Sequence, residues 1–453
     1  MSVVIGIDIG SSAIKAVLFA AEKQDVIHSV RRSGQTSRGA MDGASGHFEQ
    51  DPIAMRDAAF SIIHTLTAFA NERGDNVEAI AFTGQMHGGL LVDAALRPLT
   101  TFITWQDKRG DEIEERGQTY VESLRELAEP DPTGVGIHTG FLLSTLYWLR
   151  RHDAVPRNSA YVIGIYDWLT SLLSGRAVTD ISSAAAWGMY NPVRRIWRKE
   201  LLDSGLIPHS MLPEVAEPGD ELGYIDSRLA HELGLDPGVR IHASIGDTQA
   251  AYLGSECTPN EILLNFGTGS QSMWETTDPI ATEGTDIRYL RNSRYLACAP
   301  TLAGGEAYRI VTDFFRKAVT EFTGREISME RATEVMDRLA LESDSLGITV
   351  DPIFSGSKFR SGNERASMAG ITGENFLPGS FVRALVEGMI EEVATPYFLR
   401  ESNMRHRGIV GAGHALRQNA ALRDAAEKRF GRPLRLGRFE EEAAVGAAML
   451  CLG

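Results

Sequence analysis

The chain has little cysteine. Cys257, Cys298 and Cys451 are the three cysteines among its 453 residues, and no two of them form a C-x-x-C pair. An odd number of widely spaced cysteines is a poor basis for a disulfide framework, and without a C-x-x-C pair the usual spacing of a zinc site is missing. We therefore expect neither disulfides nor structural zinc.

Long apolar runs and an excess of basic residues are also missing. No stretch approaches the roughly 18 apolar residues of a membrane span, and residues 1–12 lack the basic start of a secretion signal. The 60 Asp and Glu outnumber the 45 Lys and Arg, which gives a formal charge of −15 and argues against a nucleic-acid surface. We expect a cytoplasmic protein that binds neither nucleic acid nor membrane.

Three catalytic motifs are absent as well, namely G-x-x-x-x-G-K-[ST], H-E-x-x-H and G-x-S-x-G. Walker-type nucleotide hydrolases, zincins and serine hydrolases with a nucleophile elbow therefore lose their main support. A chain of this length with 43% hydrophobic and 23% charged residues is typical of a globular enzyme of two domains, or of one large elaborated domain.

The sequence is organised around residues 241–254, which read IHASIGDTQAAYLG. Residues 241–245 predict a short strand, Gly246 a turn, and residues 248–253 the start of a helix. Asp247 lies at this junction. It is either the N-cap of the helix or a carboxylate at a strand end, where open α/β sheets bind ligands and a general base is well placed.

A hairpin is predicted at the start of the chain. Two apolar runs, residues 3–9 and 14–20, flank the short polar sequence Gly-Ser-Ser at 10–12, which favours strand, turn, strand rather than a P-loop. A plain hairpin is the simpler interpretation. Asp8, however, is a charged residue inside an apolar strand and needs a partner, for which a hydrated Mg²⁺ is suitable.

The same plan returns in the second half. Residues 261–266 predict a strand, residues 267–270 (Gly-Thr-Gly-Ser) a turn, and a second strand-like run reaches Trp274. Two such hairpins, one near the start of each half, predict a duplicated architecture. Their backbone N–H groups and hydroxyls are suited to binding phosphates.

Two polar clusters follow strand-like runs in the first half. One is Q-M-H-G-G at residues 85–89, and the other is W-Q-D-K-R at residues 105–109. An aromatic face that packs on the C–H groups of a sugar, beside amides and carboxylates that bind hydroxyls, is a common composition for a carbohydrate site. A buried structural histidine is the plainer interpretation of His87, but the two clusters together predict a site of polyol size.

Residues 408–410 predict a strand that leads into Gly411, Ala412 and Gly413, and residues 415–430 predict a helix. A loop so poor in side chains either admits a nucleotide or is only a tight strand-to-helix turn. The further predicted helices are 52–69 with Asp51 as its N-cap, 328–341, 380–397, and a small-residue helix at 440–450.

Eight segments, in this order along nearly the whole chain, resemble the FGGY carbohydrate kinases of the sugar-kinase, Hsp70 and actin superfamily: GIDIGSSAIK, TGQMHG, ITWQDKRG, SIGDTQAA, NFGTGS, GITGENFLPGSFVRALVEGM, VGAGHALRQNAAL and EEAAVGAAML. The resemblance implies an α/β fold of two ribonuclease-H-like domains, residues 1–243 and 244–453, with a central cleft. It also implies a kinase that uses ATP and Mg²⁺ to phosphorylate a ketose.

The resemblance also implies a role for individual residues. Asp247 would be the catalytic base and Asp8 would organise Mg²⁺. The sugar would be contacted by Gln85, Met86, His87, Trp105, Asp107 and Gln249. ATP would be contacted by Gly10, Ser11, Ser12, Lys15, Gly267, Thr268, Gly269, Gly304, Gly305, Gly411, Ala412 and Asn419.

Within the family, the segments TWQD, TGFLLSTLYWL, SSAAAWGMYN and MLPEVAEPG are most similar to kinases of a seven-carbon ketose, and kinases of five-carbon ketoses come next. The implied partners are a small-molecule ketose and MgATP, and a homodimer is left open. The alternative of another class is a chaperone-like ATPase of the same superfamily. Such a protein needs no sugar pocket, so the two polar clusters argue against it.

Overall fold

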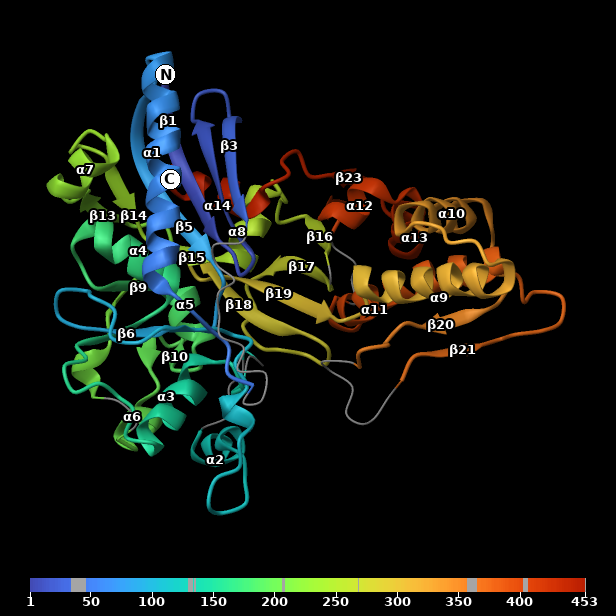
Figure 1. The fold of residues 1–453 in the computed structure, drawn as a ribbon, viewed down its shortest axis with the longest axis horizontal. Coiled ribbons are helices and arrows are strands. Elements are labelled where there is room, and N and C mark those ends of the chain that lie inside the picture. Colours follow the sequence, from blue (N-terminus) through green and yellow to red (C-terminus); the bar gives the residue numbers. More distant parts are fainter. Residues whose placement is uncertain are drawn as a thin grey trace. The chain divides into compact units, whose positions relative to one another are not determined.

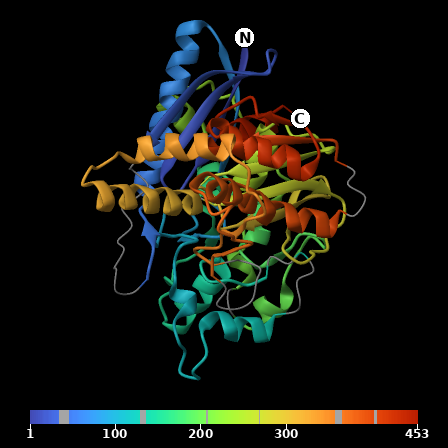
Figure 2. The same cartoon turned by 90° about the vertical axis from the view of Figure 1, so that its right-hand side faces the viewer.

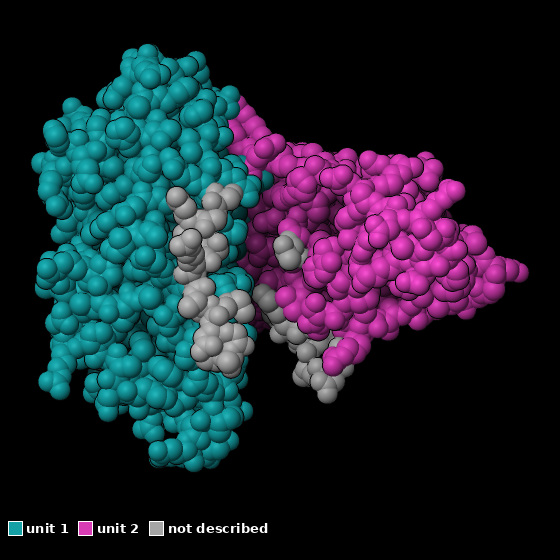
Figure 3. All heavy atoms as spheres, viewed as in Figure 1, with its two compact units in different colours: residues 1–254, 288–295, 441–453 teal, residues 255–287, 296–440 magenta. Residues whose placement is uncertain are grey.

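The computed structural model describes residues 1–33, 46–128, 133, 136–205, 208–267, 269–356, 365–401 and 406–452. The chain divides into two compact units, shown in different colours in Figure 3. Unit 1 holds residues 1–254, 288–295 and 441–453, and unit 2 holds residues 255–287 and 296–440.

Unit 1 contains strands β1 to β15, the helices before residue 255 and the last helix of the chain, many of which are labelled in Figure 1. The strands are β1 (Ser2–Ile9), β2 (Ala13–Ala20), β3 (Asp25–Ser33), β4 (Glu49–Gln50), β5 (Asn76–Gly84), β6 (Leu90–Val92), β7 (Phe102–Ile103), β8 (Tyr161–Ile163), β9 (Val178–Asp180), β10 (Tyr190–Asn191), β11 (Ile196–Trp197), β12 (Glu214–Ala216), β13 (Glu221–Tyr224), β14 (Arg240–His242) and β15 (Ile245–Gly246). The helices are α1 (Pro52–Arg73), α2 (Tyr120–Leu127), α3 (Leu142–Arg151), α4 (Ile165–Ser174), α5 (Ile181–Ala186), α6 (Lys199–Asp203), α7 (Ser227–Leu233), α8 (Asp247–Gly254) and α14 (Glu442–Leu450).

The main sheet of unit 1 has the order β13-β14-β5-β1-β2-β3, and β15 also pairs with β5. Strands β1, β2 and β3 form an antiparallel meander, whereas β5 runs parallel to β1 and to β14. Alternate residues of β1 pack with α1, α4 and α7 in one hydrophobic core. α14 packs on the strands β1, β2 and β5 and on α8. Burial on both faces explains why β1 is an almost continuous apolar run.

Small residues let α14 approach the sheet and α8 closely. A Cβ on Gly6 of β1 would lie 2.0 Å from the backbone oxygen of Ala444, and one on Gly446 would lie 1.9 Å from that of Ala250. The small residues of the last helix therefore allow close packing. This packing also explains why the chain end belongs to unit 1.

Unit 2 contains the remaining elements. Its strands are β16 (Glu261–Phe266), β17 (Ser270–Thr276), β18 (Asp286–Arg291), β19 (Arg294–Thr301), β20 (Thr349–Asp351), β21 (Ser367–Ala369), β22 (Gly408–Ala412) and β23 (Leu434–Leu436). Its helices are α9 (Gly305–Thr323), α10 (Met329–Glu342), α11 (Pro378–Arg400), α12 (His414–Gln418) and α13 (Ala420–Phe430). Helices α9 and α10 lie side by side, as Figure 2 shows. The tip of the β18–β19 hairpin, residues 288–295, is counted with unit 1.

The sheet of unit 2 repeats the plan of unit 1. Its order is β18-β19-β17-β16-β22-β23, in which β16 and β17 are antiparallel and β16, β22 and β23 are parallel. β16 and β22 therefore take the places of β1 and β5. Gly84, the last residue of β5, and Gly413, the residue directly after β22, are both closely packed, because a Cβ would meet the backbone oxygen of the neighbouring strand at 2.6 Å on Gly84 and at 2.5 Å on Gly413. The predicted duplication and the α/β fold class are confirmed.

Some predicted boundaries differ from those in the structure. The compact units separate after residue 254 rather than at 243/244, so that Asp247 lies in unit 1, because β15 pairs with β5 and α8 packs on α14. The strand predicted at 241–245 is divided into β14 and β15. The helix predicted at 415–430 is divided into α12 and α13, because Asn419 caps the second of them. By contrast, Asp51 caps α1 as predicted, with Pro52 at the first helical position.

Candidate active site

Three parallel strands of unit 1 end side by side. Ile9 of β1 and Gly246 of β15 both pair with Gly84 of β5, so the three residues form one row across the sheet. The carboxyl ends of parallel strands are where open α/β sheets bind ligands. The chain continues from this row into the predicted site residues Gly10, Gln85 and Asp247.

Asp247 is the first residue of α8 rather than its N-cap, and its side chain is partly exposed. Its Oδ1 accepts a hydrogen bond from the hydroxyl of Thr248, 3.2 Å away, whereas a capping aspartate accepts from the N–H groups two and three residues ahead. Burial raises the pKa of this carboxyl, and the guanidinium of Arg288 opposes the rise. A carboxylate with a raised pKa at a strand end can accept a proton from a substrate hydroxyl.

Asp8 is buried on β1, opposite Lys15 of β2 and Thr83 of β5. Its Oδ1 has no hydrogen-bond partner among the described residues. Burial, followed by the nearby charge of Asp247, raises the pKa of Asp8 to about 7, while Lys15 lowers it. The carboxylate is therefore held where a cation would stabilise its charged form.

These residues fit a Mg²⁺ ion that keeps most of its water. Such an ion needs only one or two protein carboxylates, and Asp8 offers a buried oxygen with Asp247 and Glu441 acting on the same carboxyl. In the part of the chain that the structure describes, no group of three or more His, Cys, Asp and Glu side chains is arranged to hold a metal ion. The donors thus fit a hydrated ion better than a fully coordinated one.

The turn after β1 is connected through the side chain of Gln50 to Gln85, the residue that follows β5. Gly10 N–H donates to the carbonyl of Ala13 at 3.1 Å and closes the turn. The Nε2 of Gln85 donates to Oε1 of Gln50 at 2.8 Å, and the Nε2 of Gln50 donates to the carbonyl of Ser11 at 3.1 Å. Ser12 at the tip is exposed. These two hydrogen bonds help to hold the turn in its conformation.

Lys15, which the resemblance assigns to ATP, is paired within unit 1. Its Nζ lies 2.6 Å from Oε2 of Glu441, the N-cap residue of α14. Both side chains are partly exposed. This ion pair brings the start of α14 to the first hairpin. The charge of Lys15 is therefore partly neutralised by Glu441, and its contact with a phosphate stays a prediction.

His87 has a strained backbone, with φ of 73°. Its Nδ1 donates to the carbonyl of Ala186 at 2.8 Å, and its ring stacks on Phe141 with centroids 4.3 Å apart. A positive φ at a residue that is not glycine costs energy and is often found at functional sites. The neighbouring Met86 is buried, and its sulfur would lie 2.4 Å from a Cβ on Gly246, so this cluster packs directly beside the strand that precedes Asp247.

The second polar cluster separates into an exposed and a buried part. Trp105 is 46% exposed, so its indole is accessible to a ligand. Asp107 is fully buried and its oxygens already accept hydrogen bonds from the Phe48 N–H at 2.7 Å and from the guanidinium of Arg109 at 2.8 and 3.1 Å. Trp105 therefore has an exposed aromatic face, and its contact with a sugar stays a prediction, whereas Asp107 is engaged within the protein.

Gln249 of α8 is buried, and its Nε2 donates to the carbonyl of Tyr289 at 3.0 Å. Its Oε1 has no partner among the described residues. Tyr289 also donates to Glu217 through its hydroxyl, at 2.5 Å. The amide of Gln249 thus anchors the tip of the β18–β19 hairpin at one end and keeps an acceptor at the other.

In unit 2, the turn between β16 and β17 lies at the start of a long helix. The N–H of Gly305, the first residue of α9, donates to the carbonyl of Gly267 at 2.9 Å. A Cβ on Gly304 would lie 2.4 Å from the backbone of Gly269, so the turn and the helix start are in close contact. A helix N-terminus with a glycine turn beside it is suited to binding phosphates. Thr268 lies outside the described residues.

The remaining predicted nucleotide contacts lie after β22. Gly411 and Ala412 are buried in that strand. The Oδ1 of Asn419 accepts from the N–H of Leu422 at 3.0 Å, and its Nδ2 donates to Asp337 at 2.8 Å. Both ends of this amide already have partners in unit 2, so a direct role in binding adenosine stays a prediction.

Three residues of the site were not found by the sequence reasoning. Arg288 donates through Nη1 to the hydroxyl of Thr248 at 3.0 Å and so reaches the surroundings of Asp247. Gln50 and Glu441 support the first hairpin, as described above. None of the three belongs to a glycine-rich or aromatic pattern, and each reaches the site only through folding.

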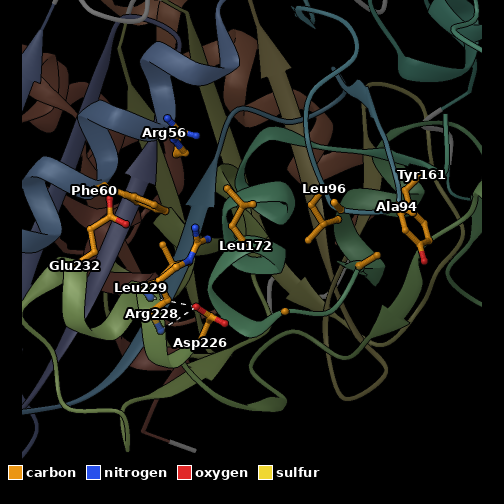
Figure 4. A pocket seen from close by; sticks show the side chains of 13 residues that line it. Arg56, Phe60, Ala94, Leu96, Tyr161, Leu172, Asp226, Arg228, Leu229 and Glu232 are labelled. Atoms are coloured by element: carbon orange, nitrogen blue, oxygen red, sulfur yellow. Dashed lines mark hydrogen bonds between the residues drawn. The ribbon is translucent and has the colours of Figure 1, made fainter. Parts of the chain in front are cut away.

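A separate cavity of about 440 Å³ lies in unit 1 between α1, α4 and α7 (Figure 4). Apolar side chains line it together with two arginines and two acids; among its lining residues are Arg56, Phe60, Tyr161, Asp226, Arg228 and Glu232. None of the predicted site residues lines this cavity. It is therefore distinct from the strand ends that carry Asp8 and Asp247.

The fold consists of two α/β units with a duplicated sheet, and the carboxylates of Asp8 and Asp247 lie at the strand ends of unit 1. The model of the FGGY family of carbohydrate kinases, N-terminal domain, matches residues 3–254. The chain belongs to the FGGY family of carbohydrate kinases. No helix among the described residues is long and apolar enough to cross a membrane.

Individual relatives agree with this family. The chain is 26% identical to a sedoheptulokinase of Homo sapiens, over 99% of this chain and 97% of that protein. It is also 26% identical to a xylulose kinase of Staphylococcus epidermidis, over 99% of this chain and 87% of that one. The crystal structure of a xylulose kinase from Rhodospirillum rubrum superposes with a TM-score of 0.85 at 23% identity, covering 99% of this chain and 89% of that chain.

Proposed function

We propose that the protein transfers the γ-phosphoryl group of ATP to the primary hydroxyl of a ketose, and that sedoheptulose, yielding sedoheptulose 7-phosphate, is its substrate. The observation that carries the reaction is the pair of carboxylates at the strand ends of unit 1. Asp247 has a raised pKa and is partly exposed, and Asp8 keeps a buried oxygen without a protein partner.

Asp247 acts as the general base. Its carboxylate accepts the proton of the sugar hydroxyl as that oxygen forms a bond to the γ-phosphorus and the bond from this phosphorus to the bridging oxygen of ADP breaks. The proton stays on Asp247 until product leaves and is then lost to water. Arg288 favours the ionised form of this carboxylate, because its charge opposes the effect of burial on the pKa.

Asp8 would hold Mg²⁺, which, when bound, would neutralise charge on the phosphate oxygens. The turns supply the remaining groups. The N-terminus of α9 and the glycines beside it offer N–H groups to phosphates in unit 2, and the turn held by Gln50 does so in unit 1. Trp105 and His87 are the groups we assign to the sugar, because one is exposed and the other is held in a strained conformation.

The choice of ketose rests on similarity. The sedoheptulokinase and the xylulose kinase are equally identical to this chain, but the chain covers 97% of the first and 87% of the second. Xylulose is therefore the second candidate substrate. A chaperone-like ATPase of the same superfamily is the remaining alternative, and it would release ADP without any sugar.

The test is ADP release with sedoheptulose, xylulose, ribulose, fructose and glycerol at saturating MgATP. We expect the highest kcat/KM with sedoheptulose and a much slower release without sugar, because a free water molecule is not positioned for attack on the γ-phosphorus as a bound sugar hydroxyl is. A higher kcat/KM with xylulose would replace the proposed substrate. ADP release indifferent to every sugar would overturn the kinase proposal.

A further inference from the structure

A buried chain of hydrogen bonds runs from the start of α5 to the backbone before Asp247. Asp180, which is fully buried, caps α5 by accepting from the N–H of Ser182 at 2.7 Å and from that of Ser183 at 3.3 Å. The hydroxyl of Ser182 donates to the same oxygen of Asp180. That hydroxyl in turn accepts from the N–H of Gly246 at 2.9 Å.

This chain acts on the residue immediately before the proposed base. β15 consists of Ile245 and Gly246 alone, and β5 pairs with it on one edge. Ser182 binds the N–H of Gly246, and Met86 stands within 2.4 Å of where a Cβ of Gly246 would be. The strand that leads into Asp247 is thus held by its pairing with β5, by the hydroxyl of Ser182 and by the packed side chain of Met86.

Capping alone does not require this arrangement. An N-cap aspartate needs to bind only the backbone N–H groups of its own helix, and Ser183, next along that helix, donates its hydroxyl to Asp167 instead, at 2.6 Å. Ser182 is the residue that connects Asp180, the N-cap of α5, to Gly246 of β15. Because its hydroxyl both donates to Asp180 and accepts from Gly246, the acidic side chain sets the direction in which the hydroxyl offers its lone pair.

We propose that Asp180 and Ser182 are positioning residues that hold the backbone of Gly246, and through it the carboxylate of Asp247, in the geometry for proton transfer. The proposal rests on the proposed function of Asp247 as the base. Both side chains are buried, and we assign neither of them a contact with a substrate. They act only by orienting Asp247. A displacement of about 1 Å at a reacting group can lower the rate by on the order of 10².

The experiment compares Ser182→Ala with the matched control Ser183→Ala in the full-length protein. Both serines lie in one turn of α5 and both are 2% exposed, but only Ser182 reaches Gly246. We expect Ser182→Ala to lower kcat by roughly 10- to 100-fold with little change in KM for ATP, and Ser183→Ala to stay within about twofold of the parent. Equal losses in both variants would overturn the proposal.

Two further measurements separate positioning from a general loss of folding. Asp180→Asn keeps a capping oxygen and an acceptor for the Ser182 hydroxyl, so we expect it to retain much of the activity, whereas Asp180→Ala behaves like Ser182→Ala. In an Asp247→Asn background, Ser182→Ala should reduce the residual rate no further, because the base it positions is gone. An additive loss in that background would contradict the proposal.

Failure of the proposed function has a different signature. If Asp247→Asn turned over as fast as the parent, Asp247 would not be the base and the proposed mechanism would fail, whatever the serine variants did. If Asp247→Asn were inactive and Ser182→Ala fully active, the proposed mechanism would stand and the positioning role would be overturned. The melting temperature of each variant shows whether it has folded.

Discussion

The two hairpins of the duplicated fold carry different chemistry at equivalent places. Asp8 of β1 and Asn265 of β16 each stand two residues before the glycine of the turn, and they pair with Lys15 and Gln271 respectively. Unit 1 thus places a carboxylate where unit 2 places an amide. The first hairpin therefore carries a charged side chain at this position, and the second carries a neutral one.

The difference extends to what surrounds each turn. In unit 1 the neighbouring strand end leads into Asp247, and the charges of Asp247 and Glu441 both act on Asp8. In unit 2 the neighbouring element is the N-terminus of the 19-residue helix α9, which favours anions. In the mechanism that we propose, unit 1 therefore supplies the two carboxylates, and unit 2 supplies a helix N-terminus beside its turn.

The largest expected effect comes from removing the carboxylate of Asp247, which we propose as the general base in unit 1. Asp247→Asn should lower kcat by on the order of 10² or more, because general base catalysis contributes about that much. ATP affinity and the melting temperature should change little, since the amide is nearly isosteric. Steady-state kinetics would measure kcat, and a titration with a fluorescent nucleotide would measure ATP affinity. Turnover near that of the parent would contradict the role of Asp247 as the base.

Asp8→Asn makes the first hairpin resemble the second. We expect the Mg²⁺ concentration for half-maximal rate to rise on the order of tenfold or more, because the charge of the ligands governs affinity for a hard cation. The reciprocal Asn265→Asp adds a carboxylate near the predicted phosphate turn and should raise KM for ATP instead. A magnesium titration of both variants distinguishes the two hairpins, and identical responses would show that they are equivalent.

Gly304→Ala should damage the phosphate turn of unit 2. The new Cβ would lie 2.4 Å from the backbone of Gly269, so the turn must move, and kcat/KM for ATP should fall by roughly 10- to 100-fold. Gly373→Ala in the same unit is the control, because its Cβ would meet nothing within 4 Å. Equal kinetics for the two variants would argue against nucleotide binding at this turn.

Trp105→Ala tests the predicted sugar contact in unit 1, as Gly304→Ala tests the predicted phosphate turn in unit 2. Loss of an exposed aromatic face should raise KM for the sugar by roughly tenfold, which corresponds to about 1.4 kcal/mol, and should leave KM for ATP unchanged. Trp105→Phe, which keeps an aromatic ring, should recover most of the affinity. If ATP and sugar were affected alike, Trp105 would be structural rather than a sugar contact.

The smallest effect concerns pH. Burial raises the pKa of Asp247 and Arg288 lowers it, so removing the charge in Arg288→Gln should raise this pKa further. A base works only when ionised, so kcat/KM falls as the pH drops through its pKa, and the acid limb of the profile should move to higher pH. Arg288→Lys keeps the charge and should leave the limb near its original place. An unmoved limb in Arg288→Gln would remove Arg288 from the proposed site.

Much of this site could be predicted from local sequence. Asp8 stands out as a charge in an apolar strand, and Asp247 follows a strand and a glycine. The two glycine turns repeat at matching places. These signals work because strand periodicity, turn chemistry and helix capping depend on residues close together in the chain. The duplicated α/β fold follows from the same patterns, and so does the cap at Asp51.

Other features depend on residues that lie far apart in the sequence. Arg288 reaches Thr248 from 40 positions away, and Gln50 reaches Gln85 from 35. Lys15 meets Glu441 from the other end of the chain, and the packing of α14 on α8 draws the boundary between the units at residue 254. A hydrogen bond or ion pair is decided by which groups folding brings within about 3 Å, and no local pattern encodes that distance. The sequence by itself therefore determined the strands, the turns and the two carboxylates, whereas the tertiary structure decided which side chains tune them and which predicted contacts, such as Asp107, are already engaged.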